Sequence, residues 1–261
     1  MNKKFFDDPI VKKWVPAEIT EWAEKIIEES FKEAVNEEAR GKVRHKIMHS
    51  LEVVKMGNKI VDETPENKWN KSLAITICLL HDIGRFSQVR QNSYSDYKTG
   101  IDHGTFGAKM VGENKIDYSK FGISGSELVE AVMWHNKKEY LGENKYAKFI
   151  RDADKTALFL IFDVAEADSE EERLRGNKIK PIVWERLEKR EAVDNRMVES
   201  LAEQAINVAS WLWDLNLAYS RKLALEVGAD KKLINMLKQA GCGTGEIKRL
   251  EKNLEEFRKL A

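Results

Sequence analysis

Histidine and aspartate residues recur where the spacing of apolar residues predicts a buried helix face. His49 shares a helical face with Val53 and Met56, and His81 follows Ile77 by four residues. A lone histidine on such a face is usually a hydrogen-bonded core residue. Burial of an unpaired charge costs several kcal/mol, roughly 2–7 even for a neutral polar group. The histidines and their neighbouring carboxylates therefore need partners inside the protein.

Six residues share this inward or helix-terminal position, and they include four of the five histidines of the chain: His49, His81, Asp82, His103, His135 and Asp154. Bound cations would satisfy the carboxylates and would take neutral imidazoles as ligands. The set therefore predicts a metal site, although no single member does so by itself.

The elements that must position these residues are helices. The chain has only 4 prolines and 15 glycines in 261 residues, and its apolar residues follow a helical period. Helices are predicted over about residues 16–39, 43–61, 64–81, 124–135 and 145–168, with others from 103 and from 194 onward. The stretch 84–102 has no clear period and predicts a long loop. No alternating pattern is long enough for a sheet, so the predicted fold class is all-α.

The amino-acid composition argues against several classes of protein. Hydrophobic residues make up 42% of the chain, enough for a core, and 44 basic residues balance 44 acidic ones. Zero net charge argues against a nucleic-acid-binding surface. Two distant cysteines, Cys78 and Cys242, fit a reducing compartment better than a disulfide framework. Without a signal-peptide core or an apolar run long enough for a membrane span, we expect a soluble, cytoplasmic protein with no membrane partner.

The motifs around these residues resemble a known family. His49 in HSLEVV, the His81-Asp82 pair in HDIGR and Asp154 in RDADK are similar to the H…HD…D signature of HD-domain metal-dependent phosphohydrolases. The added His103 in DHGTFGA and His135 in WHNKK resemble the subset of that family that holds two metals.

The resemblance covers about residues 43–165 and implies an HD-domain-like helical bundle. We expect this domain over residues 1–170. Residues 171–261 are expected to form a helical C-terminal extension that packs on it, and they leave open whether the chain forms oligomers.

The resemblance also implies a binuclear centre of two divalent transition metal ions. His49, His81 and Asp154 would bind one ion, His103 and His135 the other, and Asp82 would bridge them. Imidazole ligands favour Mn or Fe, while Co, Ni and Zn also fit. A hydroxide that bridges the ions would attack the phosphorus of a phosphate ester, in a nucleotide or another small phosphorylated metabolite.

Cations and polar groups near the ligands are candidates for substrate contacts. Asp82, Arg85 and Lys155 are expected to have catalytic roles, and the candidate substrate-binding residues are Arg85, Gln88, Arg90, Asp96 and Lys137. A structural ion pair explains Arg85 and Lys155 equally well, and the substrate role of Lys137 is a weaker case of the same kind. A solvated surface loop explains Gln88, Arg90 and Asp96 at least as well.

Two other functions fit the same residues. One is a diiron oxygenase, because some relatives use the same six ligands for that chemistry. The other is a regulatory module that binds a metal or nucleotide without turnover, although a complete ligand set argues against it.

Overall fold

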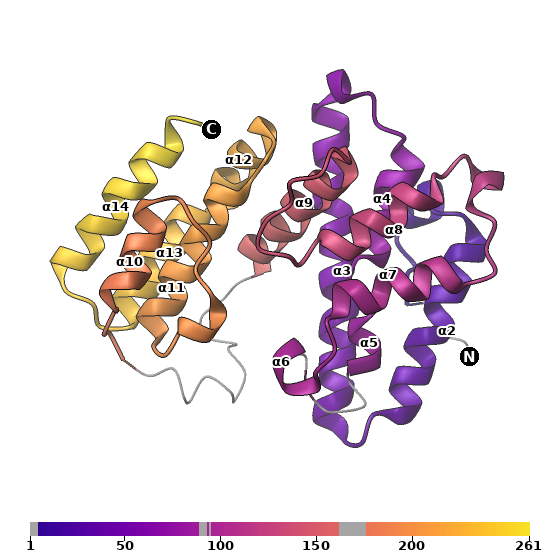
Figure 1. Ribbon diagram of the computed structural model, residues 1–261, viewed down its shortest axis with the longest axis horizontal. Coiled ribbons are helices and arrows are strands. Elements are labelled where there is room, and N and C mark those ends of the chain that lie inside the picture. Colours follow the sequence, from indigo (N-terminus) through magenta and orange to yellow (C-terminus); the bar gives the residue numbers. More distant parts are fainter. Residues whose placement is uncertain (1–4, 89–92, 94, 162–175) are drawn as a thin grey trace. The chain divides into compact units, whose positions relative to one another are not determined.

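The chain divides into two compact units. The computed structural model describes residues 5–88, 93, 95–161 and 176–261, and its units are residues 1–157 and 158–261 (Figure 1). The domain boundary expected between residues 170 and 171 lies outside the described residues. Every regular element among the described residues is helical, so the all-α prediction is confirmed. None of these helices has the length and apolar character required to cross a membrane.

Unit 1 contains the predicted site. Its α-helices are α1 (Pro9–Trp14), α2 (Ala17–Glu33), α3 (Glu37–Glu63), α4 (Lys71–Leu80), α5 (Arg85–Gln88), α6 (Asp96–Thr99), α7 (His103–Glu113), α8 (Gly125–Trp134) and α9 (Lys145–Ile161), the last of which continues into unit 2. Two 3₁₀ helices, η1 (Pro65–Asn67) and η3 (Tyr118–Phe121), lie in its connections.

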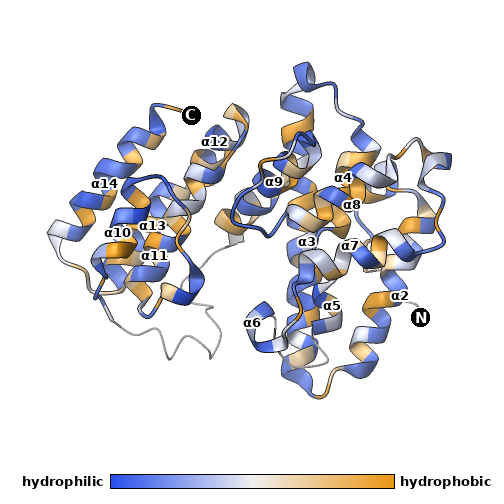
Figure 2. Ribbon diagram, in the orientation of Figure 1, coloured by the Kyte–Doolittle hydropathy of each residue, from blue (hydrophilic) through white to orange (hydrophobic). Residues whose placement is uncertain are grey.

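Helix α4 is the centre of this unit. All of its residues from Leu73 to Leu80 are buried, and it packs against α1, α3 and α8. Figure 2 shows its largely apolar character, whereas the ribbons of α2 and α3 carry both hydrophilic and apolar residues. Each fully buried leucine or isoleucine contributes roughly 1.5–3 kcal/mol relative to exposure. The carboxyl end of α4, where His81 and Asp82 follow, is therefore fixed inside the bundle.

Two predicted helix boundaries were wrong, and polar caps explain both. The helix expected over 16–39 ends at Glu33, and Asn36 caps a new helix by accepting a hydrogen bond from the amide of Ala39 at 2.8 Å. The helix expected from Thr64 begins instead at Lys71, capped by Asn70, because Lys68 adopts a left-handed conformation (φ 48°) that separates η1 from α4.

The stretch 84–102 is not wholly irregular. It includes the short helices α5 and α6, and Asp102 then caps α7 by accepting from the amide of Thr105 at 2.8 Å. Helix α8 is capped in the same way by Ser124, as its sequence predicts.

Unit 2 has its own core. Its α-helices are α10 (Pro181–Glu188), α11 (Leu201–Ser210), α12 (Ala218–Glu226), α13 (Ala229–Gln239) and α14 (Thr244–Arg258), and its 3₁₀ helices are η6 (Asn195–Met197) and η7 (Trp211–Asp214). Helix α11 lies at its centre, with α10 and α13 packed against it. Leu212, Leu250 and Phe257 are fully buried in this core.

Gly84 allows the end of α4 to approach the start of α7. A Cβ at this position would lie 2.8 Å from the backbone nitrogen of Gly107 and closer still to the carbonyl oxygen of His103. Both are backbone atoms, which cannot rotate away as a side chain can. The absence of a side chain at residue 84 therefore lets His81 and Asp82 lie beside His103.

We predict that Gly84→Ala lowers the free energy of unfolding by about 1–3 kcal/mol, because the methyl group forces these two backbones apart. Urea denaturation measures the effect. Gly41→Ala in α3 is the matched control, since a Cβ there meets nothing within 4 Å. That control should stabilise the protein by about 0.5–1 kcal/mol, as expected for Gly→Ala in a helix. Equal effects of the two substitutions would contradict the close approach.

Candidate metal centre

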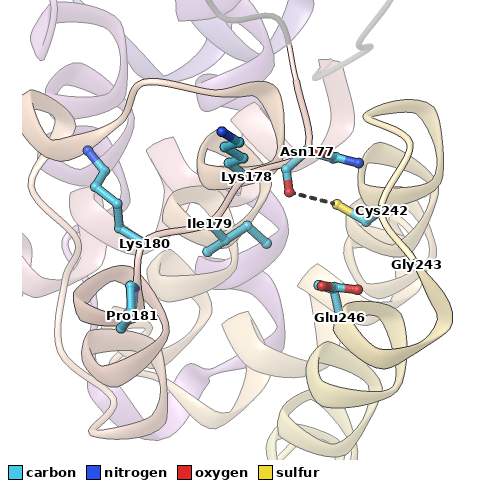
Figure 3. A pocket seen from close by; sticks show the side chains of 8 residues that line it. All are labelled: Asn177, Lys178, Ile179, Lys180, Pro181, Cys242, Gly243 and Glu246. Carbon is cyan, nitrogen blue, oxygen red and sulfur yellow. Dashed lines mark hydrogen bonds between the residues drawn. The ribbon is translucent and has the colours of Figure 1, made fainter.

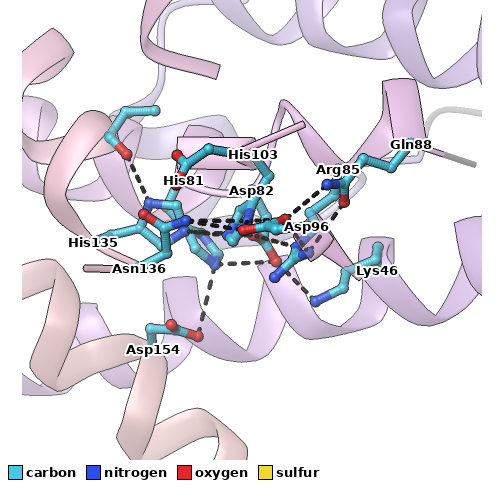
Figure 4. Close-up of polar contacts among 12 residues, drawn as sticks. Lys46, His81, Asp82, Arg85, Gln88, Asp96, His103, His135, Asn136 and Asp154 are labelled. Atoms are coloured by element: carbon cyan, nitrogen blue, oxygen red, sulfur yellow. Dashed lines mark hydrogen bonds and ion pairs between the residues drawn. The ribbon is translucent and has the colours of Figure 1, made fainter. Parts of the chain in front are cut away.

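The fold brings the six predicted ligands together from five segments. His49 lies within α3, His81 and Asp82 follow α4, His103 begins α7, His135 follows α8, and Asp154 lies within α9 (Figure 4). All except Asp154 are buried, and Asp154 is partly exposed. Their side chains converge in one place although they span 106 residues of sequence, from 49 to 154.

One group of donors consists of His49, His81 and Asp154. The Nε2 atom of His49 lies 3.0 Å from Asp154 Oδ1 and 3.4 Å from the Nε2 atom of His81. His81 Nε2 is in turn 3.8 Å from Asp154 Oδ1. These ligand atoms lie within 4.8 Å of one another, a spacing that one metal ion can span.

A second group surrounds the Asp82 carboxylate. Its Oδ1 atom is 3.3 Å from His103 Nε2 and 3.5 Å from His135 Nε2. Its Oδ2 atom is 3.6 Å from His81 Nε2 and 3.8 Å from His49 Nε2. The two oxygens of Asp82 therefore face different pairs of histidines.

In three of these imidazole rings, the Nδ1 atom donates a hydrogen bond to a neighbouring oxygen of the protein. His81 Nδ1 is 2.8 Å from the carbonyl oxygen of Cys78, and His135 Nδ1 is 2.7 Å from that of Val132. His103 Nδ1 is 2.8 Å from both carboxylate oxygens of Asp96. Because these oxygens only accept hydrogen bonds, each Nδ1 carries the proton. In the neutral ring, Nε2 then presents a lone pair.

These lone pairs face one another without a proton between them. His103 Nε2 and His135 Nε2 are 3.1 Å apart, and the Asp82 carboxylate lies beside both. Burial lowers the pKa of His81 to about 4 and that of His103 to about 4, so both rings are neutral at neutral pH. Converging lone pairs and carboxylate oxygens repel unless a cation lies among them. The donor set therefore fits divalent transition metal ions.

Both carboxylates remain ionised in this setting. Burial opposes ionisation of Asp82, but the positive charge of Lys46 and neighbouring groups outweigh it, so the pKa of Asp82 lies well below its usual range. Burial also opposes ionisation of Asp154, yet the hydrogen bond with His49 lowers its pKa below the usual range.

Comparison with protein families agrees with this geometry. The family model described as HD domain matches residues 47–158, a range that includes all six candidate ligands. The match supports an HD domain over residues 47–158. Domains of this family are typically metal-dependent hydrolases. No curated protein and no solved structure gives a significant match to the chain.

Lys46 lies at the candidate metal centre, and the sequence analysis missed it. Its Nζ atom lies 2.9 Å from Asp82 Oδ2, and its side chain is 14% exposed. The signal was its position one helical turn before His49, on the same face of α3. A lysine in a charged stretch gave no reason to separate it from its surface neighbours.

Arg85 lies between two carboxylates. Its Nε atom is 3.5 Å from Asp82 Oδ1, and its Nη1 atom donates to Asp96 Oδ1 at 3.0 Å and to Gln88 Oε1 at 3.1 Å. The guanidinium thus holds the candidate ligand Asp82 and Asp96 in fixed positions. Its predicted contact with substrate stays a prediction.

The other candidate substrate residues have partners within the protein. Gln88 is fully buried, and its amide donates to Asp96 at 2.7 Å and to the carbonyl oxygen of Ile101 at 2.8 Å. Lys137 forms an ion pair with Asp102 at 2.5 Å, at the start of α7. These contacts connect the segments on either side of the candidate metal centre. The predicted substrate roles of both residues stay predictions. Arg90 lies outside the described residues.

Lys155 follows the ligand Asp154 on α9. Its Nζ atom lies 3.5 Å from the carbonyl oxygen of Arg151, and its predicted catalytic role stays a prediction.

Arg151 is a second residue that the sequence analysis missed. It is 1% exposed and donates to the carbonyl oxygens of Trp134 at 3.1 Å, Lys138 at 3.0 Å and Lys137. Carbonyl groups at the end of a helix lack hydrogen-bond donors within that helix, and this arginine supplies donors to them at the end of α8. It thereby fixes the turn that follows His135.

A shallow pocket in unit 2 contains none of these candidate residues. Its lining includes the exposed Lys178 and the partly exposed Cys242 and Glu246 (Figure 3). The thiol of Cys242 lies 3.8 Å from the carbonyl oxygen of Asn177. Burial raises the pKa of Cys242, which makes its thiol less reactive.

We predict that the metal-free protein loses stability as the pH falls from about 6.5 to about 4. His81 and His103 take up protons in the unfolded chain near their ordinary pKa of 6.5, but in the folded protein only near 4. The folded state binds fewer protons in this range, so its stability rises with pH. The loss should reach a few kcal/mol, at about 1.4 kcal/mol for each unit of pKa.

Urea denaturation of the chelated protein at several pH values measures this loss. His103→Gln removes one of the two histidines and should give a shallower dependence on pH. A stability that is flat between these pH values would contradict the neutral, buried state of the rings.

Proposed function

We propose that this protein is a phosphohydrolase that uses two divalent metal ions to cleave a phosphate ester of a nucleotide or another small phosphorylated metabolite. The observation that carries the proposal is the convergence of the Nε2 lone pairs of His81, His103 and His135 on the two oxygens of Asp82. The HD domain match supports the hydrolytic class.

The candidate ligands would divide between the two ions. His49, His81 and Asp154 would hold one, His103 and His135 the other, and Asp82 would contact both through its separate oxygens. Two such ions lower the pKa of a shared water and stabilise the charge of a phosphoryl group in displacement. Imidazole and carboxylate donors favour Mn or Fe over Mg or Ca.

The protein's own cations would assist with the negative charge of the substrate. Lys46 and Arg85 lie within 3.5 Å of opposite oxygens of Asp82. When a metal ion neutralises Asp82, these cations become available to attract a phosphate group.

The test is release of inorganic phosphate from a panel of nucleotides, phosphodiesters and sugar phosphates in the presence of Mn²⁺, Fe²⁺, Co²⁺, Ni²⁺ or Zn²⁺. We expect hydrolysis of at least one class, complete loss in excess chelator after dialysis, and recovery when metal returns. Asp82→Ala should abolish it. Full activity in chelator would contradict the proposal, and oxygen consumption by the iron-loaded protein without phosphate release would favour the oxygenase.

The number of bound ions is a separate prediction. Elemental analysis should find about two metals per chain in the wild type, since each half of the cluster offers its own donors. His103→Ala and His135→Ala should each lower this towards one, with a sharp loss of activity.

The fifth histidine provides a matched control for stoichiometry. His45 lies one turn before His49 but is exposed, so His45→Ala should keep both metals. Two metals in His103→Ala and His135→Ala would leave these residues as core histidines and would contradict the two-metal proposal.

A further inference from the structure

Asp96 occupies an unusual place among the groups around the metal centre. It is the first residue of α6, a helix of only four residues that Ser95 caps and Gly100 ends in a left-handed conformation (φ 65°). Both of its carboxylate oxygens lie 2.8 Å from Nδ1 of His103. A short turn between two longer helices thus places a charged acceptor behind one candidate ligand.

The position of His103 in its helix explains why it needs such a partner. His81 and His135 follow the last turn of a helix, and each bonds to the carbonyl oxygen three residues before it. His103 is the first residue of α7, so no preceding turn of its own helix can supply this carbonyl. Its Nδ1 proton must find an acceptor elsewhere in the fold, and Asp96 provides it.

Three further donors hold the Asp96 carboxylate in place. Arg85 Nη1 donates at 3.0 Å, Gln88 Nε2 at 2.7 Å and Asn136 Nδ2 at 3.3 Å. Asn136 directly follows His135, the other candidate ligand of the same ion. The carboxylate is therefore fixed from α5 and from the end of α8, and it can fix the His103 ring in turn.

A carboxylate acceptor does more than orient an imidazole. It favours the tautomer with the proton on Nδ1 and raises the basicity of Nε2 more than a neutral carbonyl does. In His103 that Nε2 atom points towards Asp82 Oδ1 at 3.3 Å and His135 Nε2 at 3.1 Å.

We propose that Asp96 is a positioning residue that holds His103 in the ligand tautomer and thereby sets the affinity of the second metal ion. This inference rests on the proposed two-metal function. It replaces the substrate contact expected for Asp96, because a carboxylate whose two oxygens serve His103, Arg85, Gln88 and Asn136 is engaged within the protein. The first ion, held by His49, His81 and Asp154, does not depend on this carboxylate.

The experiment titrates Mn²⁺ or Co²⁺ alone into the metal-free wild type and into Asp96→Asn, by calorimetry. The substitution keeps the size of the side chain but removes its charge. We expect the second equivalent to bind about 10–100-fold more weakly in the variant, with the affinity of the first equivalent unchanged. Manganese resonance spectra should lose the signal of two coupled ions at metal concentrations that saturate the wild type.

Asp117→Asn is the matched control. Asp117 likewise lies at the start of a short helix, η3, but its carboxylate accepts from the amide and the hydroxyl of Ser119. This variant should bind both ions as the wild type does.

A second measurement does not depend on how the variant folds. Nitrogen-15 spectra of the histidines in the metal-free wild type should show His103 with its proton on Nδ1. A proton on Nε2 would overturn the proposal.

The outcomes distinguish this inference from the proposed function. Equal affinities of wild type and Asp96→Asn for both ions would overturn the role of Asp96 and leave the two-metal hydrolase intact. Equal weakening of both ions would also overturn it, because it would show a general loosening. A wild type that binds two ions but hydrolyses no phosphate ester would contradict the function alone. A wild type that binds only one ion would overturn both.

Discussion

The repulsion among buried acceptors is the constraint on which the site depends. Two carboxylates and four imidazoles converge within a helical core, and three of the rings have their only proton directed away from the centre. Such an arrangement is stable only if positive charge enters it. Lys46 and Arg85 supply part of that charge, and metal ions of the kind used by HD domains would supply the rest. The same feature that makes the cluster costly in an empty protein gives it affinity for cations.

Three of the candidate histidine ligands lie at the end or the start of a helix, and this placement fixes their orientation. His81 and His135 each follow a helix and use a carbonyl oxygen of its last turn to fix their tautomer, so one local geometry serves both. His103 begins a helix and lacks this possibility, and the short turn of α6 supplies Asp96 instead. Gly84 then lets the end of α4 and the start of α7 approach closely enough for Asp82 to contact both pairs of histidines. Positioning of the centre thus depends on backbone packing as much as on the ligands.

Two buried side chains hold the segments next to the candidate ligands in place. Arg151 donates hydrogen bonds to carbonyl oxygens at and after the end of α8. Gln88 donates both to Asp96 and to the carbonyl oxygen of Ile101, in the segment before α7. Neither faces the metal donors directly. Unit 2 has a separate core around α11, and the described residues of that unit include no group of histidines and carboxylates with metal-ligand spacing.

The sequence by itself determined the all-α class and the six candidate ligands, because helical periodicity and the burial of histidines on apolar faces are local properties. The spacing of Ser124 and Glu127 is likewise a local pattern, typical of a capping box, and Ser124 caps α8. The sequence analysis misplaced the end of α2 and the start of α4, where the caps formed by Asn36 and Asn70 and the left-handed conformation of Lys68 set the boundaries instead of the apolar period. Only the tertiary structure decided which groups share the centre. Lys46 meets Asp82 across 36 residues because α3 packs against α4. Asp96 meets His103 in a region where α5 packs against both α3 and α7.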